Sequence, residues 1–213
     1  MPRISESTVR RLSHYYRVLE EVAAEGQKLI SSHLLAEREG ITSAQVRKDL
    51  SYFGSFGRRG LGYQVDHLRT EIRGILGLDR RWRVAVVGAG HIGSALMAYR
   101  GFASQGFDVV AVFDSSPARV GQSLGELTIR HLDTLTREDA IDMAVISTPV
   151  RAAQEVADVL AAAGVRGILN FAPRKLKAPA EVTVRAVDMT MEFESLSFSL
   201  SQARPGSRRR AAD

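Results

Sequence analysis

The 213-residue chain is long enough for one large domain or two small ones, each with its own hydrophobic core. It has no cysteine, which excludes disulfides, thiolate zinc sites and thiol-based redox switches, and no apolar run approaches the roughly 20 residues needed to cross a bilayer. The net charge of +5 comes from the first part alone, because residues 1–83 carry 15 Lys and Arg against 10 Asp and Glu whereas residues 84–213 carry 14 of each, and we therefore expect a polyanionic partner for that part.

The first predicted element is a helix over residues 7–25. Leu12, Tyr16 and Leu19 recur at helical spacing and form an apolar stripe, and Gly26 follows as a stop signal. Arg17 points away from this stripe, so by itself it is interpreted as a solvated arginine.

Two short helices follow and form a helix-turn-helix pattern. Ser31 or Ser32 caps the first, which ends at Gly40; Thr42 or Ser43 caps the second, which is expected to run to Gly54. One side of the second helix is apolar, and the other carries small and basic groups with almost no acid except Asp49. Taken alone such a face is more often an ordinary solvated surface, but its chemistry also suits the DNA major groove.

A glycine-rich hairpin with an arginine pair, residues 55–63, comes directly after this helix. Glycines allow a turn that brings backbone and guanidinium groups close to a phosphate or into a narrow groove, so helix and hairpin together resemble a winged helix. The predicted DNA-binding residues are Ser43, Ala44, Gln45, Arg47, Lys48, Ser51, Arg58, Arg59 and Gly60. An amphipathic helix over residues 65–78 then leads to a linker.

Strands and helices alternate in the remainder of the chain. Strands are predicted at residues 83–87, 107–114, 127–130, 143–147, 167–171 and 181–188, and helices at 94–99, from Asp133 onward and at 151–163. The uniformly apolar first strand belongs inside a parallel sheet. The fold class is therefore α/β, with a winged-helix domain followed by a Rossmann-like, doubly wound parallel sheet.

A GxGxxG motif at Gly88–Gly93 lies between the first of these strands and a helix, the context in which it binds a dinucleotide. Gly88 permits the tight turn, Gly90 lets the backbone approach a pyrophosphate and Gly93 allows close helix packing. Asp114 ends the second strand, 21 residues past Gly93; unless it is only a turn residue, its carboxylate takes the ribose hydroxyls and favours NAD(H) over NADP(H).

Further cofactor contacts are expected from strand ends at the carboxyl edge of the sheet. The predicted cofactor-binding residues are Gly88, Ala89, Gly90, His91, Ile92, Gly93, Asp114, Thr148, Pro149, Asn170, Phe171, Ala172 and Pro173. His91 is interpreted as flanking the phosphates. No catalytic residue and no metal ligand is predicted.

The segment 192–202 carries large apolar side chains at Phe193, Leu196, Phe198 and Leu200, too many for a tail in water. It packs either on its own domain or on a partner subunit. The expected domains are residues 1–80, 81–190 and 191–204, followed by a disordered basic tail at 205–213. Since we find no secretory signal at the start, the expected compartment is the cytoplasm, with no membrane partner.

With both halves described, the chain resembles the Rex family of redox-sensing transcriptional repressors over nearly its whole length. The residues that carry the resemblance are QVRKDLSYFGSFGRRGLGY (45–63), VVGAGHIGSAL (86–96), FD (113–114) and GILNFAP (167–173). It implies a homodimer with an exchanged C-terminal helix, which binds palindromic operators and is released when NADH binds.

The resemblance also implies individual roles. Arg47 and Lys48 would reach the major groove, and Arg58 and Arg59 the neighbouring minor groove and backbone. Arg17, Tyr99 and Asp188 would form a contact between subunits that depends on the ligand state. One departure from the family pattern is visible, because Met189 stands where relatives can carry an aromatic residue beside the expected nicotinamide pocket.

Two other functions remain as alternatives. A nicotinamide-dependent dehydrogenase would need a substrate domain and an acid or base over the ring, whereas only 25 residues follow Asp188 and the five histidines form no evident set; we therefore expect no enzyme. A DNA-binding regulator could instead sense another nucleotide such as CoA or an adenylate. Asp114 favours a free ribose and argues only weakly against the 3′-phosphate of CoA.

Overall fold

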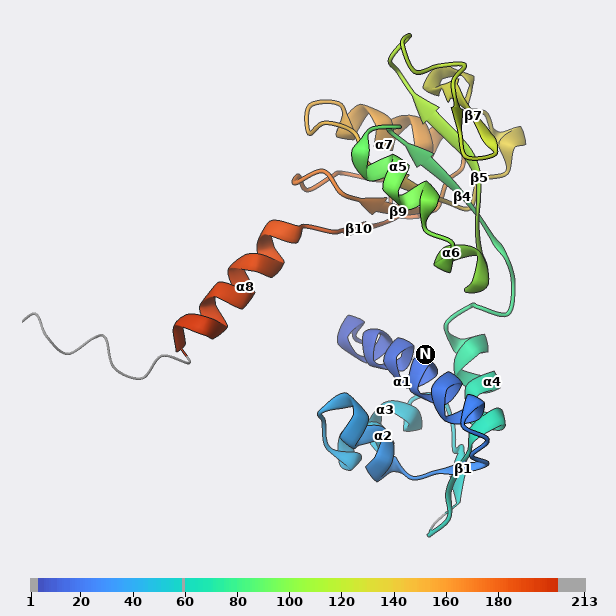
Figure 1. Ribbon diagram of the computed structural model, residues 1–213, viewed down its shortest axis with the longest axis vertical. Coiled ribbons are helices and arrows are strands. Elements are labelled where there is room, and N and C mark those ends of the chain that lie inside the picture. Colours follow the sequence, from blue (N-terminus) through green and yellow to red (C-terminus); the bar gives the residue numbers. More distant parts are fainter. Residues whose placement is uncertain (1–3, 59, 203–213) are drawn as a thin grey trace, which may run out of the picture. The chain divides into compact units, whose positions relative to one another are not determined.

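The computed structural model describes residues 4–58 and 60–202. The chain divides into two compact units, the first ending at Arg80 and the second beginning at Arg81 (Figure 1). Arg59, the last two residues of the predicted 191–204 segment and the predicted tail lie outside the described residues.

The first unit contains four helices and a small antiparallel sheet among its described residues (Figure 1). The helices are α1 (Glu6–Ala24), α2 (Ser32–Glu39), α3 (Ser43–Ser51) and α4 (Val65–Ile75), and the strands β1 (Leu29–Ile30), β2 (Gly57–Arg58) and β3 (Gly62–Gln64) are ordered β1-β3-β2. The wing hairpin and the helix-turn-helix are thus both present, as predicted from the sequence.

Side-chain caps and one glycine set the helix boundaries of the helix-turn-helix. Ser31 caps α2 by accepting the Leu34 N–H, and Thr42 caps α3 by accepting the Gln45 N–H. Gly40 ends α2 with φ +65°, a left-handed conformation that glycine adopts without strain. The prediction that α3 runs to Gly54 was wrong, because the helix ends at Ser51.

One hydrophobic cluster joins α1 to the other three helices and to β1 and β3. Its largest fully buried members are Leu12, Tyr15, Leu19, Val22, Ile30, Leu35, Leu50, Leu68 and Ile72. Burial of this stripe is what makes α1, the longest helix of the unit, its scaffold.

The second unit is a seven-stranded sheet with the order β10-β9-β8-β4-β5-β7-β6. All pairs are parallel except β6 with β7. The strands are β4 (Trp82–Val87), β5 (Phe107–Asp114), β6 (Ser123–Leu124), β7 (Leu127–His131), β8 (Met143–Ile146), β9 (Gly167–Asn170) and β10 (Thr183–Ala186). The chain starts at β4, proceeds outward through β5 and β7, then returns to β8 and continues to β10, which is the Rossmann order.

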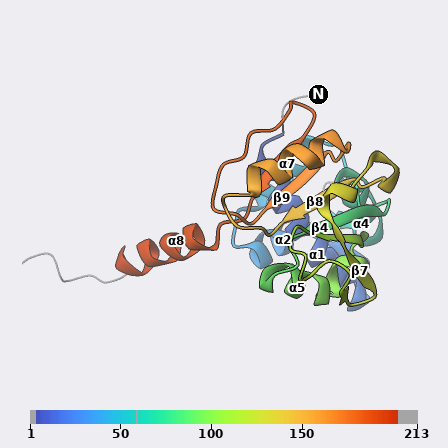
Figure 2. The same cartoon turned by 90° about the horizontal axis from the view of Figure 1, so that it is seen from above.

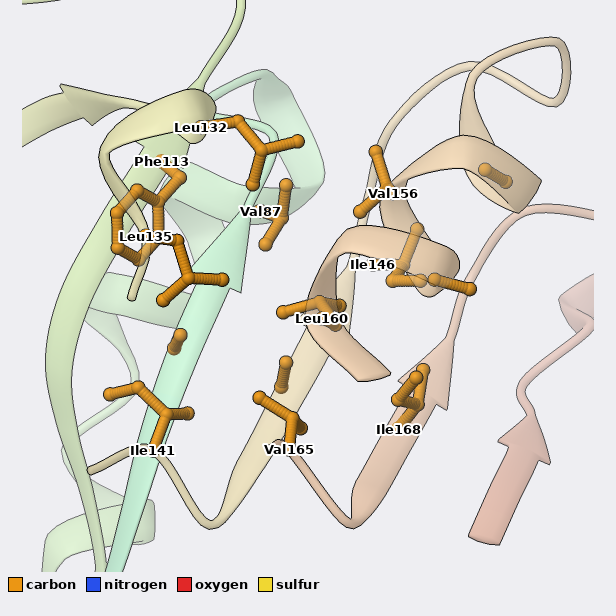
Figure 3. Close-up of a cluster of buried hydrophobic side chains, with 14 of the residues drawn as sticks. Val87, Phe113, Leu132, Leu135, Ile141, Ile146, Val156, Leu160, Val165 and Ile168 are labelled. Carbon is orange, nitrogen blue, oxygen red and sulfur yellow. The ribbon is translucent and has the colours of Figure 1, made fainter. Parts of the chain in front are cut away.

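Helices cover both faces of this sheet (Figure 2). α7 (Ala153–Ala162) packs on one face, where Val156 and Leu160 point toward Val87, Ile146 and Ile168 of three neighbouring strands (Figure 3). α5 (His91–Ala98) packs on the other, and its Leu96 and Met97 lie against Val84, Val86 and Val145. Apolar side chains on both faces explain why these strands alternate so little in polarity.

Three details differ from the sequence prediction. α5 begins at His91, so this residue is in the helix and not in the loop. The helix expected from Asp133 is replaced by two 3₁₀ turns, Leu132–Thr134 and Arg137–Asp139, and a capping box between Thr136 and Asp139 fixes the start of the second. A short helix, α6 (Gly101–Ser104), was not predicted.

The last described element is α8 (Met189–Gln202), which begins three residues before the predicted Glu192. None of its residues is buried, and its six large apolar side chains, Met189, Met191, Phe193, Leu196, Phe198 and Leu200, are 53–67% exposed. No helix in the described part of the chain is long and apolar enough to span a membrane.

Candidate functional sites

The chain direction reverses at the centre of the second sheet, where β4 lies between β5 and β8. At such a switch point the loops after the two central strands diverge and leave a crevice at the carboxyl edge of the sheet, which is where open α/β sheets bind ligands. Every cofactor residue that the sequence predicts lies at the carboxyl end of β4, β5, β8 or β9, in the loop that follows one of these strands, or in the first turn of α5.

The glycine loop after β4 is built against the loop after β8. Gly88 has φ +101°, and a Cβ there would lie 2.8 Å from the backbone of Ser147. The Ser147 hydroxyl donates to the carbonyls of Gly88 (2.8 Å) and Val87 (3.1 Å). A Cβ at Gly93 would overlap the Gly88 carbonyl, so this glycine permits the close helix packing that the motif predicts.

Gly90 differs from its two neighbours in the motif. It has an ordinary negative φ of −75°, and a Cβ at this position would meet no atom within 4 Å. The chain itself therefore imposes no need for glycine here, and open space lies in front of the backbone. A ligand that approaches this backbone would supply the missing constraint.

Asp114 ends β5 beside the glycine loop and is half-buried. One carboxylate oxygen accepts the Ala89 N–H and the other the Ser116 N–H, both at 2.8 Å. Arg119 donates to the Ala89 carbonyl, so both backbone polar groups of Ala89 are held by the last residue of β5 and by the loop that follows it. The carboxylate retains lone pairs for a further donor such as a ribose hydroxyl.

Thr148, in the loop after β8, has the one buried side-chain polar atom without a hydrogen-bond partner among the described residues. A buried hydroxyl without a partner costs about 1–3 kcal/mol, so such groups in folded proteins call for an explanation. Its place beside the glycine loop fits a ligand that supplies the partner. Pro149 next to it is exposed.

The loop after β9 is shaped by Asn170, which is only 1% exposed. Its amide donates to the carbonyls of Ala172 (3.0 Å) and Arg174 (2.9 Å) and accepts the Ala172 N–H (2.9 Å). Both amide hydrogens are used within the loop. Asn170 and the buried Ala172 are thus interpreted as supports, while Phe171 and Pro173 remain accessible.

The N-terminus of α5 directly follows the glycine loop, and its first turn carries no acidic residue. The first intrahelical bond of α5 runs from the Ser94 N–H to the Gly90 carbonyl at 2.8 Å, so the preceding N–H groups have no acceptor within the helix. His91 and Ile92 are exposed on this turn. Free N–H groups and the helix dipole together favour an anion such as a phosphate.

The second candidate site is the outer face of α3 and the wing. Ala44, Arg47, Lys48 and Ser51 are exposed and Ser43 is half-exposed, as the sequence predicts for a face that meets DNA. Arg47 donates to the Ser32 hydroxyl of α2 at 2.9 Å, which orients its guanidinium along the helix-turn-helix.

In the wing, Arg58 and Gly60 are exposed, and Gly60 has φ +81°. Gly62 has φ +82°, and a Cβ there would lie 2.5 Å from the Ile30 carbonyl, so the close pairing of β3 with β1 requires glycine. Arg59, predicted as a contact, lies outside the described residues.

Asp49 does not lie on the exposed face of α3, contrary to the sequence prediction. It is fully buried and accepts four hydrogen bonds: Arg11 Nε (2.6 Å) and Nη2 (2.8 Å), the Tyr15 hydroxyl (2.8 Å) and Gln45 Nε2 (2.8 Å). Burial acts to raise the pKa of Asp49, but the bonds from Arg11, Tyr15 and Gln45 outweigh it and hold that pKa below its usual value. The exposed face of α3 is therefore free of acid.

The three residues assigned to a subunit contact are all accessible. Arg17 is exposed on α1. Tyr99, 61% exposed, follows α5 and packs edge-on against Phe102 with ring centroids 4.9 Å apart. Asp188 precedes α8 and accepts the Thr190 N–H at 2.9 Å, so its carboxylate caps the N-terminus of that helix.

Comparison with sequence families and known proteins gives a consistent result. Residues 3–51 match a family described as "Putative DNA-binding protein N-terminus", and residues 79–174 match one described as "CoA binding domain". The redox-sensing transcriptional repressor Rex of Carboxydothermus hydrogenoformans is 47% identical over 201 residues, covering 93% of this chain and 97% of that protein. Rex of Thermus thermophilus is 45% identical over 200 residues, covering 93% and 94%.

Solved structures match over the same length. A crystal structure titled as RSP in complex with β-NAD⁺ and operator DNA has a TM-score of 0.90 at 34% identity and covers 95% of each chain. RSP in complex with β-NADH has a TM-score of 0.85 at 32% identity, covering 95% of this chain and 97% of that one. RSP itself is described as a Rex-family repressor.

Proposed function

Since the chain belongs to the Rex family of redox-sensing transcriptional repressors, we propose that NADH binding in the groove beside Gly88–Gly93 releases α3 and the wing from operator DNA. It is a DNA-binding repressor and not an enzyme. One observation carries the proposal: the same chain contains a possible nucleotide site and a possible DNA site. The first is the glycine loop with the Asp114 carboxylate beside it, and the second is the basic, acid-free face of α3 around Lys48. We place its action in the cytoplasm, where a soluble nucleotide and DNA are both accessible.

In this proposal each group of the crevice takes one part of the cofactor. The pyrophosphate lies at the N-terminus of α5, against the backbone of Gly90 where a Cβ would meet nothing. Asp114 accepts the adenosine ribose hydroxyls and repels a 2′-phosphate. The unpaired Thr148 hydroxyl gains a partner from the bound nucleotide. His91, Ile92, Pro149, Phe171 and Pro173 line the rest of the groove.

The charge of the two loops proposed to lie near the nicotinamide ring supports a preference for NADH over NAD⁺. The loops after β8 and β9 carry no acid from Ser147 to Gln154 and from Asn170 to Ala180, but they carry Arg151, Arg174, Lys175 and Lys177. NAD⁺ has a positive nicotinamide ring and NADH a neutral one. A positively charged rim with apolar neighbours penalises the charged ring, so the reduced form binds better.

At the DNA end, Arg47 and Lys48 are proposed to reach base edges or phosphates in the major groove, and Arg58 and Arg59 the adjacent backbone and minor groove. Asp49 of α3 is hydrogen-bonded to Arg11 and Tyr15 of α1, and these residues with Gln45 are called the Asp49 cluster. Because the cluster joins the two helices, a displacement of α1 would move α3 as well. Arg17 lies on α1. A contact from Arg17 to Tyr99 and Asp188 of the other subunit would thus couple the two sites.

We propose that the active form is a homodimer in which α8 is exchanged between subunits. Its six exposed apolar side chains would otherwise be left in water, where large contiguous apolar surfaces are rare. Two symmetry-related α3 helices require half-sites about one helical turn apart in a palindromic operator. A rotation of the subunits on NADH binding then moves both helices out of register.

A CoA-sensing regulator is the second candidate, favoured by the family match over residues 79–174. The bonds that fix Asp114 argue against it, because the carboxylate would face the 3′-phosphate on the ribose of CoA. The full-length relatives are named as redox-sensing repressors. We therefore retain NADH as the effector.

The test is a gel-shift titration with a palindromic operator selected from a random duplex library by the full chain. Rising NADH should release the DNA at concentrations where NAD⁺ and CoA have little effect. By linkage, DNA should weaken NADH binding by the same factor by which NADH weakens DNA binding. The corresponding coupling free energy is typically about 1–3 kcal/mol. DNA binding that ignores the NADH/NAD⁺ ratio would refute the sensor function, and release by CoA alone would favour the second candidate.

The DNA half is tested separately. Lys48→Ala or Arg58→Ala should weaken operator binding by roughly tenfold or more and leave the NADH titration unchanged. Lys28→Ala, which removes an exposed charge outside α3 and the wing, is the matched control and should change neither. Loss of NADH binding in the first two variants would show that the halves had been assigned the wrong way round.

A further inference from the structure

The Asp49 cluster determines more than the packing of α3 on α1. Asp49 offers two carboxylate oxygens with about four lone-pair positions, and each oxygen accepts two of the four donors around it. Arg11 and Gln45 donate to Oδ1, and Arg11 and Tyr15 to Oδ2. The carboxylate is therefore saturated, and it is closed to solvent.

This saturation fixes the amide of Gln45. A carboxylate only accepts hydrogen bonds, so the group of Gln45 that faces Asp49 must be the NH₂ and the amide cannot be flipped. One Nε2 hydrogen is used on Asp49 at 2.8 Å. The carbonyl oxygen Oε1 and the second Nε2 hydrogen remain, and they form an acceptor next to a donor.

The position of Gln45 makes this pair useful. It is the third residue of α3, and the N-terminal residues of a helix-turn-helix recognition helix are those that reach base edges. Its side chain is partly exposed, between the exposed Ala44 and the buried Val46. A base that presents a donor next to an acceptor in the major groove would complement it, and adenine does so through N6 and N7.

Resting on the proposed function, we infer that Gln45 reads an adenine in each operator half-site, with its amide oriented in advance by Asp49, Arg11 and Tyr15. Guanine presents two acceptors, O6 and N7, in the same place. To bind guanine the amide would have to turn its NH₂ outward, which would leave the buried Asp49 carboxylate short of a donor. The cluster thus disfavours guanine as well as favouring adenine. Gln45 is the contact residue, and the other three are positioning residues.

The inference is tested by the base preference of the full chain, measured for single-base-pair variants of the operator selected from a random duplex library. Gln45→Ala should abolish the preference for A·T over G·C at one symmetric position per half-site, a change of roughly 10- to 100-fold in relative affinity, and leave preferences elsewhere intact. Lys48→Ala, on the same face, should not change the preference at that position.

The positioning role needs a readout that a loss of packing would not produce. Tyr15→Phe removes one of the four bonds to Asp49 and does not touch Gln45; it should narrow the A·T to G·C ratio at the same position while NADH still releases the DNA. Asp49→Asn should reduce the A·T to G·C affinity ratio at that position still further. Gln45→Asn, whose shorter amide cannot span the same distance, should behave like Gln45→Ala.

Two outcomes would overturn the inference. Gln45→Ala could lower the affinity for all operator variants equally, which would make Gln45 a nonspecific or structural contact. Tyr15→Phe and Asp49→Asn could leave the A·T to G·C ratio unchanged, which would remove the role of the cluster. Either result is compatible with NADH-controlled DNA release, so the inference and the proposed function fail separately.

Discussion

The carboxylate of Asp114 accepts the backbone N–H of Ala89 at 2.8 Å, so the residue expected to hold the ribose also holds the phosphate loop. The two residues lie 25 positions apart and follow neighbouring parallel strands, β4 and β5. In the proposed binding mode, one side chain thus serves both cofactor recognition and loop shape.

Substitution of Asp114 should separate these two tasks. Asp114→Asn keeps an acceptor for Ala89 but removes the charge, and should weaken NADH binding by about tenfold while reducing discrimination against NADPH. Asp114→Ala also frees the loop and should weaken NADH binding by roughly 10- to 100-fold. Fluorescence titration with NADH and NADPH measures both. Unchanged NADH affinity in Asp114→Ala would rule out the ribose contact.

The glycines of the motif should respond differently to the same substitution. Gly90→Ala places a methyl group in open space at an allowed φ, so the free energy of unfolding should change by less than about 1 kcal/mol, yet NADH affinity should fall at least tenfold because the methyl group meets the pyrophosphate. Gly93→Ala overlaps the Gly88 carbonyl and should destabilise the fold by about 1–3 kcal/mol. Urea unfolding and NADH titration distinguish the two. A Gly90→Ala protein that binds NADH normally would place the phosphates elsewhere.

The basic side chains of the loops after β8 and β9, among them Arg174 and Lys175, should determine the preference for NADH over NAD⁺. Two charges about 10 Å apart interact by roughly 0.8 kcal/mol at an effective dielectric constant of about 40. Each charge removed should therefore change the ratio of NAD⁺ to NADH affinity by about fourfold, so Arg174→Gln with Lys175→Gln should raise that ratio by roughly 15-fold, and by less at high salt. Calorimetric titration with both cofactors is the measurement, and Lys28→Gln is the control. An unchanged affinity ratio would mean that the rim lies too far from the ring.

The Asp49 cluster should give the fold an acid-sensitive component. A carboxyl whose folded pKa is lowered stabilises the protein above its unfolded pKa of about 3.9, and this contribution is lost as the pH falls through the folded pKa. Urea unfolding of the wild type should therefore show stability that declines below about pH 4. Asp49→Asn should be less stable at pH 7 and show a shallower decline. An equally steep decline in that variant would assign the acid sensitivity to other carboxyls.

Removing the cation of the cluster should cost more than removing an exposed ion pair. Arg11→Ala leaves a fully buried carboxylate with two fewer donors, and should lower the free energy of unfolding by about 3 kcal/mol. Arg10→Ala, which breaks the exposed pair with Glu6, should change it by less than about 0.5 kcal/mol. Comparable losses in the two variants would contradict the structural weight given to Asp49.

The apolar side of α8 should be needed for assembly. Positions 189, 193, 196 and 200 share one side of the helix at 100° per residue. Leu196→Glu should dissociate the proposed dimer and weaken operator binding at least tenfold, because a charge would be buried between subunits. Ser201→Glu adds the same charge away from that side and should remain dimeric. Analytical ultracentrifugation measures the oligomeric state and gel-shift titration measures operator affinity. A Leu196→Glu protein that remained dimeric would show that α8 does not form the interface.

Much of the fold could be predicted from the sequence because its signals are local. The stripe of Leu12, Tyr16 and Leu19 predicted α1, the apolar run before Gly88 predicted β4, and capping residues Ser31 and Thr42 placed two helix starts. Predictions failed where the elements are only two or three residues long, as in the 3₁₀ turn Arg137–Asp139 and in β1, because such short elements leave too few residues for a periodic pattern.

The candidate sites divide in the same way. The sequence by itself determined which residues could contact a nucleotide or DNA, because glycine spacing and the charge of one helix face depend on neighbours within a turn or two. Only the tertiary structure decided what Asp49, Asn170 and Thr148 do. The partner of Asp49 lies 38 residues away at Arg11, and an acid among basic residues on a helix has the same local pattern whether it faces water or a buried arginine. Packing brings such partners together, and burial then determines that a hydrogen bond must form.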